Sequence, residues 1–430
     1  MPRSPRSAVP IRLEWDRRAS PEARPAVLHL EADTSLSPRS TVRGRLYRGD
    51  NLDVMLALLP ELEGKIDLLY ADPPFNSGRT YRVRVGRGED SRRPTSWRQA
   101  PGYADRWPEP GAYLEMLAPR LEVMHRLLSP TGTLYLHLDW RAAAYARVLL
   151  DEIFGPDRLL NEIIWVYHGP SPIRSAFKRK HDSILVYTKS SRYTFNADAV
   201  RIPYDEATWK AFASSRRAGF GKRPQLARGK VPEDWWYFPV VARLHSERTG
   251  YPTQKPMALL ERIVRASSRR GDLVADFFCG SGTTVAAAAK AGRRWLACDR
   301  SPAAIATTYR RLLMEEPEQR IQLWSSGRRR LTRPGGLRLR WTLSGHDLEV
   351  TLPATAVDGR RASEITLWEV DWNAEGVFIS RSRGIRSWRS GELPSRLSHR
   401  YRRSGTYRVQ VRAWDSLGRV RVAERTVNMV

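Results

Sequence analysis

The chain has 430 residues, 41% of them hydrophobic, and this length and content allow more than one folded domain. Its formal net charge of +27 favours a polyanionic partner such as nucleic acid. Arginine supplies 64 of the 73 basic residues, however, and such a skew also arises in GC-rich or thermophilic genomes. No run of 18 apolar residues occurs, so the sequence excludes a membrane-spanning helix, and we expect no membrane partner.

The first 40 residues are rich in Pro, Arg and Ser without hydrophobic periodicity, and we expect residues 1–40 to be a disordered basic leader. They contain no apolar core of the kind found in secretory signals. The only cysteines, Cys279 and Cys298, have neither a disulfide framework nor zinc-ligand spacing. We therefore expect a cytoplasmic protein without a bound metal.

From residue 41 onward, apolar runs of strand length alternate with segments of helical periodicity. Strands are expected near 46–52, 68–71, 133–138, 163–167 and 183–187, with helices near 54–59, 113–128 and 141–154. Alternating strands and helices with buried-type strands predict an α/β fold with a mostly parallel, doubly wound sheet.

The strand at 68–71 ends abruptly in Asp72-Pro73-Pro74-Phe75. Open α/β sheets bind their ligands at the carboxyl ends of strands, and Pro74 restricts Pro73 to an extended backbone. The loop would then present a carboxylate, a carbonyl oxygen and an aromatic ring. These groups suit a planar amino group on a ring, since two acceptors meet its two hydrogens and the ring can stack. Taken alone, the motif is equally well explained as a strand-terminating turn.

Two polar segments interrupt the alternation. Residues 76–110 are rich in arginine interleaved with Tyr and Trp, and we expect a long functional loop there. Residues 170–250 are also basic and aromatic, apart from the strand at 183–187. Such a mixture suits phosphate contacts and base stacking, so the segment is interpreted as a target-recognition insert. A small satellite core with a solvated face is the alternative.

A second loop, between a strand ending at Asp276 and a helix at 285–291, contains Gly280 and Gly282. It lacks the third glycine of the dinucleotide fingerprint and the lysine of a phosphate-binding P-loop. Asp299 ends the next strand, 23 residues after Asp276, where an acid can accept both hydroxyls of a ribose. An acid before the glycines repels phosphate and favours a cationic ligand. These features predict a nucleoside site and favour S-adenosylmethionine, which carries an ammonium group and a sulfonium.

The order of these motifs resembles that of the β class of DNA amino-methyltransferases, which act on N6 of adenine or N4 of cytosine. The resemblance covers residues 44 to about 315. It rests on four segments in the family's order, namely Gly49–Leu52, Asp72–Phe75, Tyr251–Pro256, and Asp276–Gly282 with Asp299. It implies a Rossmann-like domain over residues 41–324 with a circularly permuted motif order.

The resemblance also implies an activity, which is transfer of a methyl group from S-adenosylmethionine to N6 of adenine in a specific sequence of double-stranded DNA, with base flipping. The residues that it assigns to catalysis are Asp72, Pro73, Pro74 and Phe75, and those that it assigns to the cofactor are Asp50, Thr253, Lys255, Asp276, Phe278, Gly280, Gly282 and Asp299. Phe75 stands where many family members have Tyr, so stacking is kept and a hydroxyl is lost.

Several alternatives stay open. N4-cytosine methylation is the second choice, because its enzymes more often carry Ser in place of Asp72. A DNA-binding protein with a relic methyltransferase fold is the third. A homodimer and a separate restriction or defence subunit are both compatible with the resemblance. His137 and Asp139 end a strand near the predicted site, where a satisfied core histidine and a capping aspartate explain them as well as a functional role.

The C-terminal part has a different pattern. A basic linker is expected at 325–336, and apolar residues then alternate with period two through residues 337–430. Short strands separated by turns predict a small all-β sandwich. Tyr401 and the segment Gly405–Tyr407 resemble the closing strands of PKD-like, immunoglobulin-type domains. DNA binding, dimerisation and capping of the enzyme domain are all open roles for this part.

Overall fold

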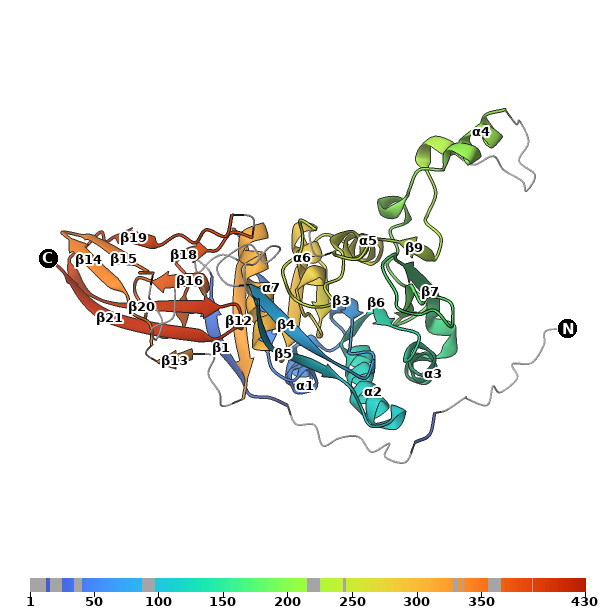
Figure 1. The fold of residues 1–430 in the computed structure, drawn as a ribbon, viewed down its shortest axis with the longest axis horizontal. Helices are drawn as coiled ribbons and strands as arrows, with labels where there is room; N and C mark the ends of the chain where they lie inside the picture. The colour runs from blue at the N-terminus through green and yellow to red at the C-terminus, as the bar shows by residue number, and fades with distance from the viewer. Residues whose placement is uncertain are drawn as a thin grey trace.

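The computed structural model describes residues 13–15, 25–34, 41–86, 97–214, 225–242, 245–327, 332–334, 336–354, 365–388 and 390–430. It has an α/β part and, beside it, a β-rich part that carries the C-terminus (Figure 1). Most of the predicted leader and the basic and aromatic residues Arg216, Arg217, Phe220, Lys222 and Arg223 of the predicted insert lie outside the described residues. Among the described residues, no helix is both long and apolar enough to cross a membrane.

The α/β part is built on a sheet whose centre is parallel. The central strands are, in spatial order, β12 (Arg320–Ser326), β2 (Val42–Arg48), β11 (Arg294–Asp299), β10 (Leu273–Asp276), β3 (Ile66–Ala71) and β6 (Leu128–Leu138). Antiparallel pairing then adds β8 (His181–Thr188) and β7 (Leu159–Val166), and β9 (Trp235–Tyr237) joins β7 in parallel. The prediction of a mostly parallel sheet is therefore confirmed.

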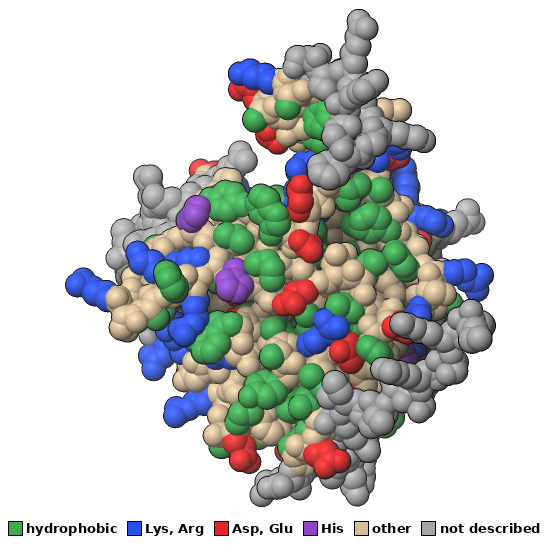
Figure 2. All heavy atoms as spheres, turned by 90° about the vertical axis from the view of Figure 1, so that its right-hand side faces the viewer, with side chains coloured by type: hydrophobic (Ala, Val, Ile, Leu, Met, Phe, Trp, Pro, Cys, Tyr) green, Lys and Arg blue, Asp and Glu red, His purple; other side chains and the backbone are tan. Residues whose placement is uncertain are grey.

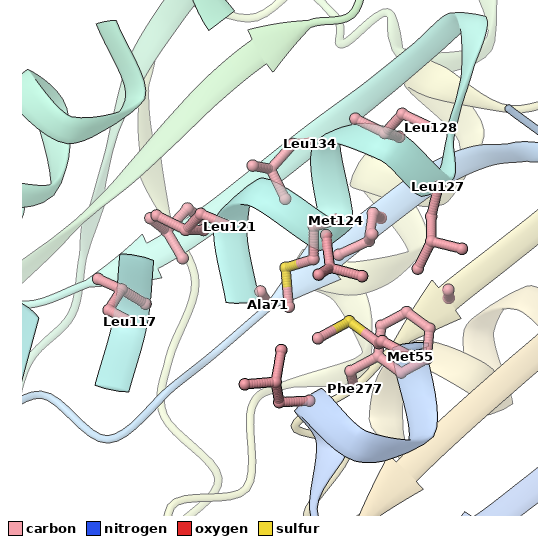
Figure 3. Close-up of a cluster of buried hydrophobic side chains, with 14 of the residues drawn as sticks. Met55, Ala71, Leu117, Leu121, Met124, Leu127, Leu128, Leu134 and Phe277 are labelled. Carbon is pink, nitrogen blue, oxygen red and sulfur yellow. The ribbon is translucent and has the colours of Figure 1, made fainter. Parts of the chain in front are cut away.

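Helices cover both faces of this sheet. One face carries α1 (Asn51–Leu62), α2 (Pro110–Leu127) and α3 (Ala143–Phe154), and the other carries α5 (Met257–Ser267), α6 (Thr283–Lys290) and α7 (Pro302–Glu315). Strand β3 shows how the sequence builds two cores, because Leu69 and Ala71 face the first group whereas Leu68 and Tyr70 face the second. Met55, Met124 and Phe277 meet in the first core (Figure 3).

The segment after Phe75 is more regular than expected. Strands β4 (Arg79–Gly86) and β5 (Trp97–Asp105) pair antiparallel, so the prediction of an irregular loop across residues 76–110 was wrong. The strands form because Thr80, Val83 and Val85 are β-branched residues among arginines, a strand-forming pattern that the high charge obscured. The strand predicted at 183–187 is β8 of the main sheet, as expected. In the rest of the predicted insert, β9 also joins the main sheet and so departs from a separate module, whereas helix α4 (Glu206–Ser214) projects from the sheet (Figure 1).

Part of the segment predicted as a disordered leader is folded. Residues Leu28–Asp33 form strand β1, which pairs antiparallel with β12. Asp33 is buried and accepts hydrogen bonds from Arg320, with a shortest distance of 2.8 Å. The alternation of apolar residues in this segment is short, and only the partner strand β12, far along the chain, makes it a strand.

The C-terminal part is a sandwich of two sheets, as predicted. One contains, in spatial order, β13 (Thr332–Pro334), β21 (Val420–Met429), β20 (Gly405–Asp415), β16 (Ile365–Asp371) and β18 (Ser382–Ile385). The other contains β14 (Arg340–Ser344), β15 (Asp347–Thr351) and β19 (Arg396–Arg400). The predicted linker at 325–336 overlaps the ends of both parts, since β12 reaches Ser326 and β13 starts at Thr332. Strand β17 (Phe378–Ile379) of this part pairs with β1, so the two parts share one sheet edge.

Candidate active site

A cavity of about 600 Å³ opens where β3 and β10 end, which is a typical size for a ligand site. Strands β3 and β10 are parallel neighbours, so the loops that follow them meet at one sheet edge. The predicted site residues that line the cavity are Asp50, Asp72, Pro73, Pro74, Phe75, Thr253, Lys255, Asp276, Phe278, Gly280 and Asp299. Gly282 does not line the cavity but caps helix α6 at its edge.

Asp72 directly follows β3 and forms an ion pair with Lys255. The Lys255 side chain is only 10% exposed, and its Nζ lies 5.3 Å from the centroid of the Phe75 ring. A nitrogen donor therefore already sits against the carboxylate and over the aromatic ring. This is the arrangement that the sequence predicted for an amino group on a base, although it did not predict the contact between Lys255 and Asp72.

Phe75 rests on a buried polar network. Its ring stacks on His137 with 5.7 Å between centroids. The two ring nitrogens of His137 contact the Tyr70 hydroxyl at 2.7 Å and Asp182 at 3.2 Å. Because a carboxylate accepts, Nε2 donates to Asp182 and Nδ1 accepts from Tyr70. Asp182 also accepts from the Tyr167 hydroxyl at 3.1 Å.

Asp182 remains ionised in this network. Burial raises its pKa, but the hydrogen bonds from His137 and Tyr167 and the nearby Lys255 charge outweigh burial and leave the pKa below its usual value. Asp182 and Tyr167 line the cavity, and the sequence had indicated neither of them. Asp139 accepts from the backbone N–H of Arg141 at 2.9 Å in the turn before α3, whereas the N-cap of α3 is Ala142.

The backbone after Phe75 is held by Asp105, which ends β5 and is 1% exposed. Its carboxylate accepts from the N–H of Asn76 at 2.6 Å and from the Ser77 hydroxyl at 2.5 Å. Asn76 has a φ of +59°, in the left-handed region that Asn tolerates better than most residues. Asp105 thus fixes the turn that follows the Asp72–Phe75 loop. It was missed because residues 76–110 were interpreted as irregular.

The second loop needs its glycines for steric reasons. Gly282 has a φ of +73°, and a Cβ there would lie 2.6 Å from Cγ2 of Thr308. Gly280 has a φ of +48°. Any other residue would strain the backbone or displace helix α7, so the loop can pass closely between β10 and α6 only with glycine at these positions.

Two carboxyls flank this loop, and burial raises the pKa of both. The pKa of Asp276 rises to about 7, with repulsion from Asp72 and Asp299 adding to burial, although hydrogen bonds from Thr284 and from the Phe278 N–H oppose the rise. Asp299 accepts from the N–H groups of Gly280 at 3.0 Å and Ser301 at 2.8 Å. A carboxylate has further lone pairs, so Asp299 can still accept hydroxyl groups.

Asp50 is tied to this loop through two residues that the sequence did not single out. Arg120 of α2 binds Asp50 at 2.8 Å and donates to Asn51 at 2.6 Å. Asn51 in turn donates to the carbonyl of Phe277 at 2.8 Å. Asp50, one of the predicted cofactor residues, is therefore held at a defined place beside the second loop.

The segment before α5 closes the cavity from another side. Thr253 has a φ of +57°, and its hydroxyl lies 3.3 Å from that of Tyr103 on β5. Gln254 holds the turn by accepting from Thr249 at 2.8 Å and donating to the Glu247 carbonyl at 2.7 Å. The Lys255 carbonyl accepts from Thr283 at 3.2 Å.

The two cysteines of this region are buried. Burial raises the pKa of each thiol well above its usual value. Neither is thus available as the thiolate that C5-cytosine methylation requires. Their interpretation as small buried residues is confirmed.

Comparison with known proteins agrees with this geometry. A family model for DNA methylases of the N6/N4 type matches residues 66–310. The chain is 27% identical over 286 residues to the type II methyltransferase M.BglII of Bacillus subtilis, covering 64% of this chain and 70% of the relative. It is 29% identical over 250 residues to the DNA adenine methyltransferase YhdJ of Escherichia coli K12, covering 57% of this chain and 76% of the relative.

A solved DNA modification methylase of Thermus thermophilus, complexed with S-adenosyl-L-methionine, is 22% identical and covers 65% of this chain and 99% of that chain, with a TM-score of 0.42. The family model spans more than half of the chain and includes both the Asp72 loop and the Gly280 loop. The chain therefore belongs to the N6/N4 family of DNA methyltransferases, whose members use S-adenosylmethionine to methylate amino groups of DNA bases.

Proposed function

We propose that this enzyme methylates N6 of adenine within a specific sequence of double-stranded DNA. The observation that carries the proposal is the placement of the Asp72 carboxylate and the Phe75 ring in one cavity with the Gly280 loop. Asp at position 72, rather than Ser, supports adenine over cytosine as the target. The similarity to an adenine methyltransferase of Escherichia coli supports the same choice.

The cavity fits S-adenosylmethionine by its charge. The Asp299 carboxylate repels that of Asp276, and a cationic ligand between them would relieve that repulsion. Asp276 would hold the ammonium group and Asp299 the ribose, while Asp50 would lie near the adenine. Thr253, Lys255, Phe278 and Gly280 would complete the walls, with Gly282 holding the loop. When bound, the cofactor supplies an electrophilic methyl group.

The protein's task is to prepare the target amine, which is a poor nucleophile because its lone pair is delocalised into the ring. The Asp72 carboxylate and the Pro73 carbonyl would accept its two hydrogens, so that the nitrogen lone pair is aimed at the incoming methyl group. Pro74 keeps that carbonyl in a fixed direction, and Phe75 stacks on the base. Lys255 has to yield its place on Asp72 as the amine arrives. Positioning and electrostatics would supply most of the acceleration.

Substitution of Asp72 tests the mechanism. Asp72→Ala is expected to stop methyl transfer while leaving S-adenosylmethionine binding intact, because Asp72 contacts the amine and not the cofactor. Asp157→Ala, at an exposed aspartate outside the cavity, is the matched control and should keep full activity. Transfer of radiolabelled methyl groups to plasmid DNA measures activity, and calorimetry measures binding. Retained methylation by Asp72→Ala would overturn the proposed role.

Nucleoside analysis of the labelled DNA tests the base. N6-methyladenine is the expected product, and N4-methylcytosine would replace the adenine assignment. If the wild-type protein binds S-adenosylmethionine but labels no DNA, the protein is a DNA-binding relative that has lost its activity. Sequencing of the methylated plasmid would also yield the recognition sequence.

A further inference from the structure

A phenylalanine is almost fully exposed on a loop whose two ends reach the cavity. Phe177 lies in the loop between β7 and β8, residues 167–180, and is 98% exposed, more than any other large apolar side chain among the described residues. An aromatic ring in water loses the free energy that burial would gain. A single exposed apolar residue is not unusual by itself, so the meaning of Phe177 depends on the loop that carries it.

The loop is anchored at the cavity rim. Tyr167 and Asp182, at its two ends, both line the cavity. The backbone N–H of Tyr167 donates to the carbonyl of Lys180 at 3.0 Å, and the Lys180 ammonium donates to the carbonyl of Pro170 at 2.8 Å. These bonds fix the base of the loop at the cavity rim, so Phe177 is carried on a segment that starts and ends beside the cavity.

The surroundings of Phe177 are cationic. Arg174, Lys178 and Arg179 are exposed on the same loop, and the Arg179 guanidinium lies 4.3 Å above the ring of Trp140, which is itself 47% exposed. Hydrophobic side chains lie among Lys and Arg at the end of the molecule that carries β7 and β9 (Figure 2). Cations before and after an apolar residue in one exposed loop match a duplex, in which phosphates flank the stacked bases.

We propose that Phe177 enters the DNA duplex at the target and fills the gap that the extruded base leaves. This inference rests on the proposed function, since it requires a base that leaves the stack to reach Asp72. The ring would stack on the neighbouring bases and offset part of the free energy needed to unpair and unstack the target. The flanking cations would hold the phosphates on either side. An acidic protein or an anionic membrane also suits a basic loop, but neither explains why the loop stands on the base cavity.

The test compares two duplexes that carry the recognition sequence found by sequencing methylated plasmid. In one the target base is paired, and in the other the opposite nucleotide is abasic, so that less free energy is needed to extrude the target. Single-turnover methylation is measured for the wild type, Phe177→Ala, Phe177→Trp and the control Phe195→Ala, whose ring is 43% exposed outside the cavity. Binding of S-adenosylmethionine is measured for each variant.

Phe177→Ala is expected to slow methylation of the paired duplex about ten- to a hundredfold, the range that loss of one stacked aromatic ring produces. Its defect should shrink to within about threefold on the duplex with the abasic partner, where base opening is easier. Phe177→Trp and Phe195→Ala should stay close to wild type. Cofactor binding should not change in any variant.

An equal defect of Phe177→Ala on both duplexes, or no defect on either, would overturn the proposal, because the ring would then play no part in opening the duplex. Loss of cofactor binding would overturn it as well. Failure of the proposed function looks different, since the wild-type protein would then methylate neither duplex.

Discussion

At the scale of single residues, the protonation of Asp276 predicts how the stability of the protein and its ligand binding depend on pH. Its pKa of about 7, against an ordinary value of 3.8, means that the folded protein holds this proton up to near-neutral pH. Between these two pH values the folded chain binds more protons at this site than the unfolded chain. The free energy of unfolding therefore falls, through this group, as the pH rises from about 4 to 7.

Binding of a cationic ligand should have the opposite pH dependence, because the ligand binds the ionised carboxylate of Asp276. Affinity for S-adenosylmethionine is expected to increase as the pH rises towards 7, by up to about tenfold per pH unit below that value. Calorimetry in two buffers of different ionisation enthalpy would then detect a proton released on binding. Asp276→Asn should bind weakly with little pH dependence, whereas Asp157→Asn should behave as wild type. Binding by wild type that is equally tight at about pH 5.5 and about pH 7 would contradict this role of Asp276.

At the scale of elements, the Asp72–Phe75 loop depends on the strands around it. Tyr70 of β3, His137 of β6 and Asp182 of β8 meet in one buried network, because these strands are neighbours in the sheet. The network forms the surface on which Phe75 rests. Alternating apolar residues in each strand predict which face is buried, but they do not reveal polar residues that satisfy one another across strands.

His137→Phe tests this support. The change keeps a ring beneath Phe75 but removes both nitrogens, so Tyr70 and Asp182 each lose a hydrogen bond at a cost of about 1–3 kcal/mol. We expect slower methylation with unchanged cofactor binding. Without the hydrogen bond from His137, the pKa of Asp182 should rise. The decrease in methylation rate at acidic pH should then begin at a higher pH. His125→Phe, on helix α2 outside the cavity, is the control. Equal pH profiles for wild type and His137→Phe would argue against the coupling.

At the scale of the whole molecule, the β-sandwich is part of one continuous structure. The buried carboxylate of Glu369 on β16 accepts from the hydroxyl of Tyr309 on α7 at 2.9 Å and from the indole of Trp414 at 3.0 Å. Arg412 of β20 donates to the carbonyl of Glu31 on β1 at 2.7 Å. With β17 paired to β1, these contacts attach the sandwich firmly to the methyltransferase part.

Loss of the central carboxylate should therefore destabilise both parts together. Glu369→Ala leaves two buried donors unpaired, and we expect the free energy of unfolding to fall by about 2–6 kcal/mol. Calorimetric melting measures the change, and Glu375→Ala, at an exposed glutamate of the same sandwich, should leave the transition nearly unchanged. A Glu369→Ala protein that melts as wild type would show that the contact contributes nothing to the docking of the two parts.

Local features of this protein follow from its sequence alone. The strand ends at Asp72 and Asp276, the glycine loop, the acid at Asp299 and the period-two pattern of the sandwich depend on residues adjacent in the chain, so short patterns reveal them. The motif order predicted the family, and the parallel sheet then brought both loops to one cavity.

Only the tertiary structure decided how these parts are held. Lys255 meets Asp72 across 183 residues, Arg120 meets Asp50 across 70, and His137 meets Asp182 across 45. Strand β1 and the attachment of the sandwich likewise depend on partners far along the chain. Each of these contacts joins side chains whose local sequence carries no periodic signal, because their stability comes from burial and complementary charge that exist only once the sheet has formed.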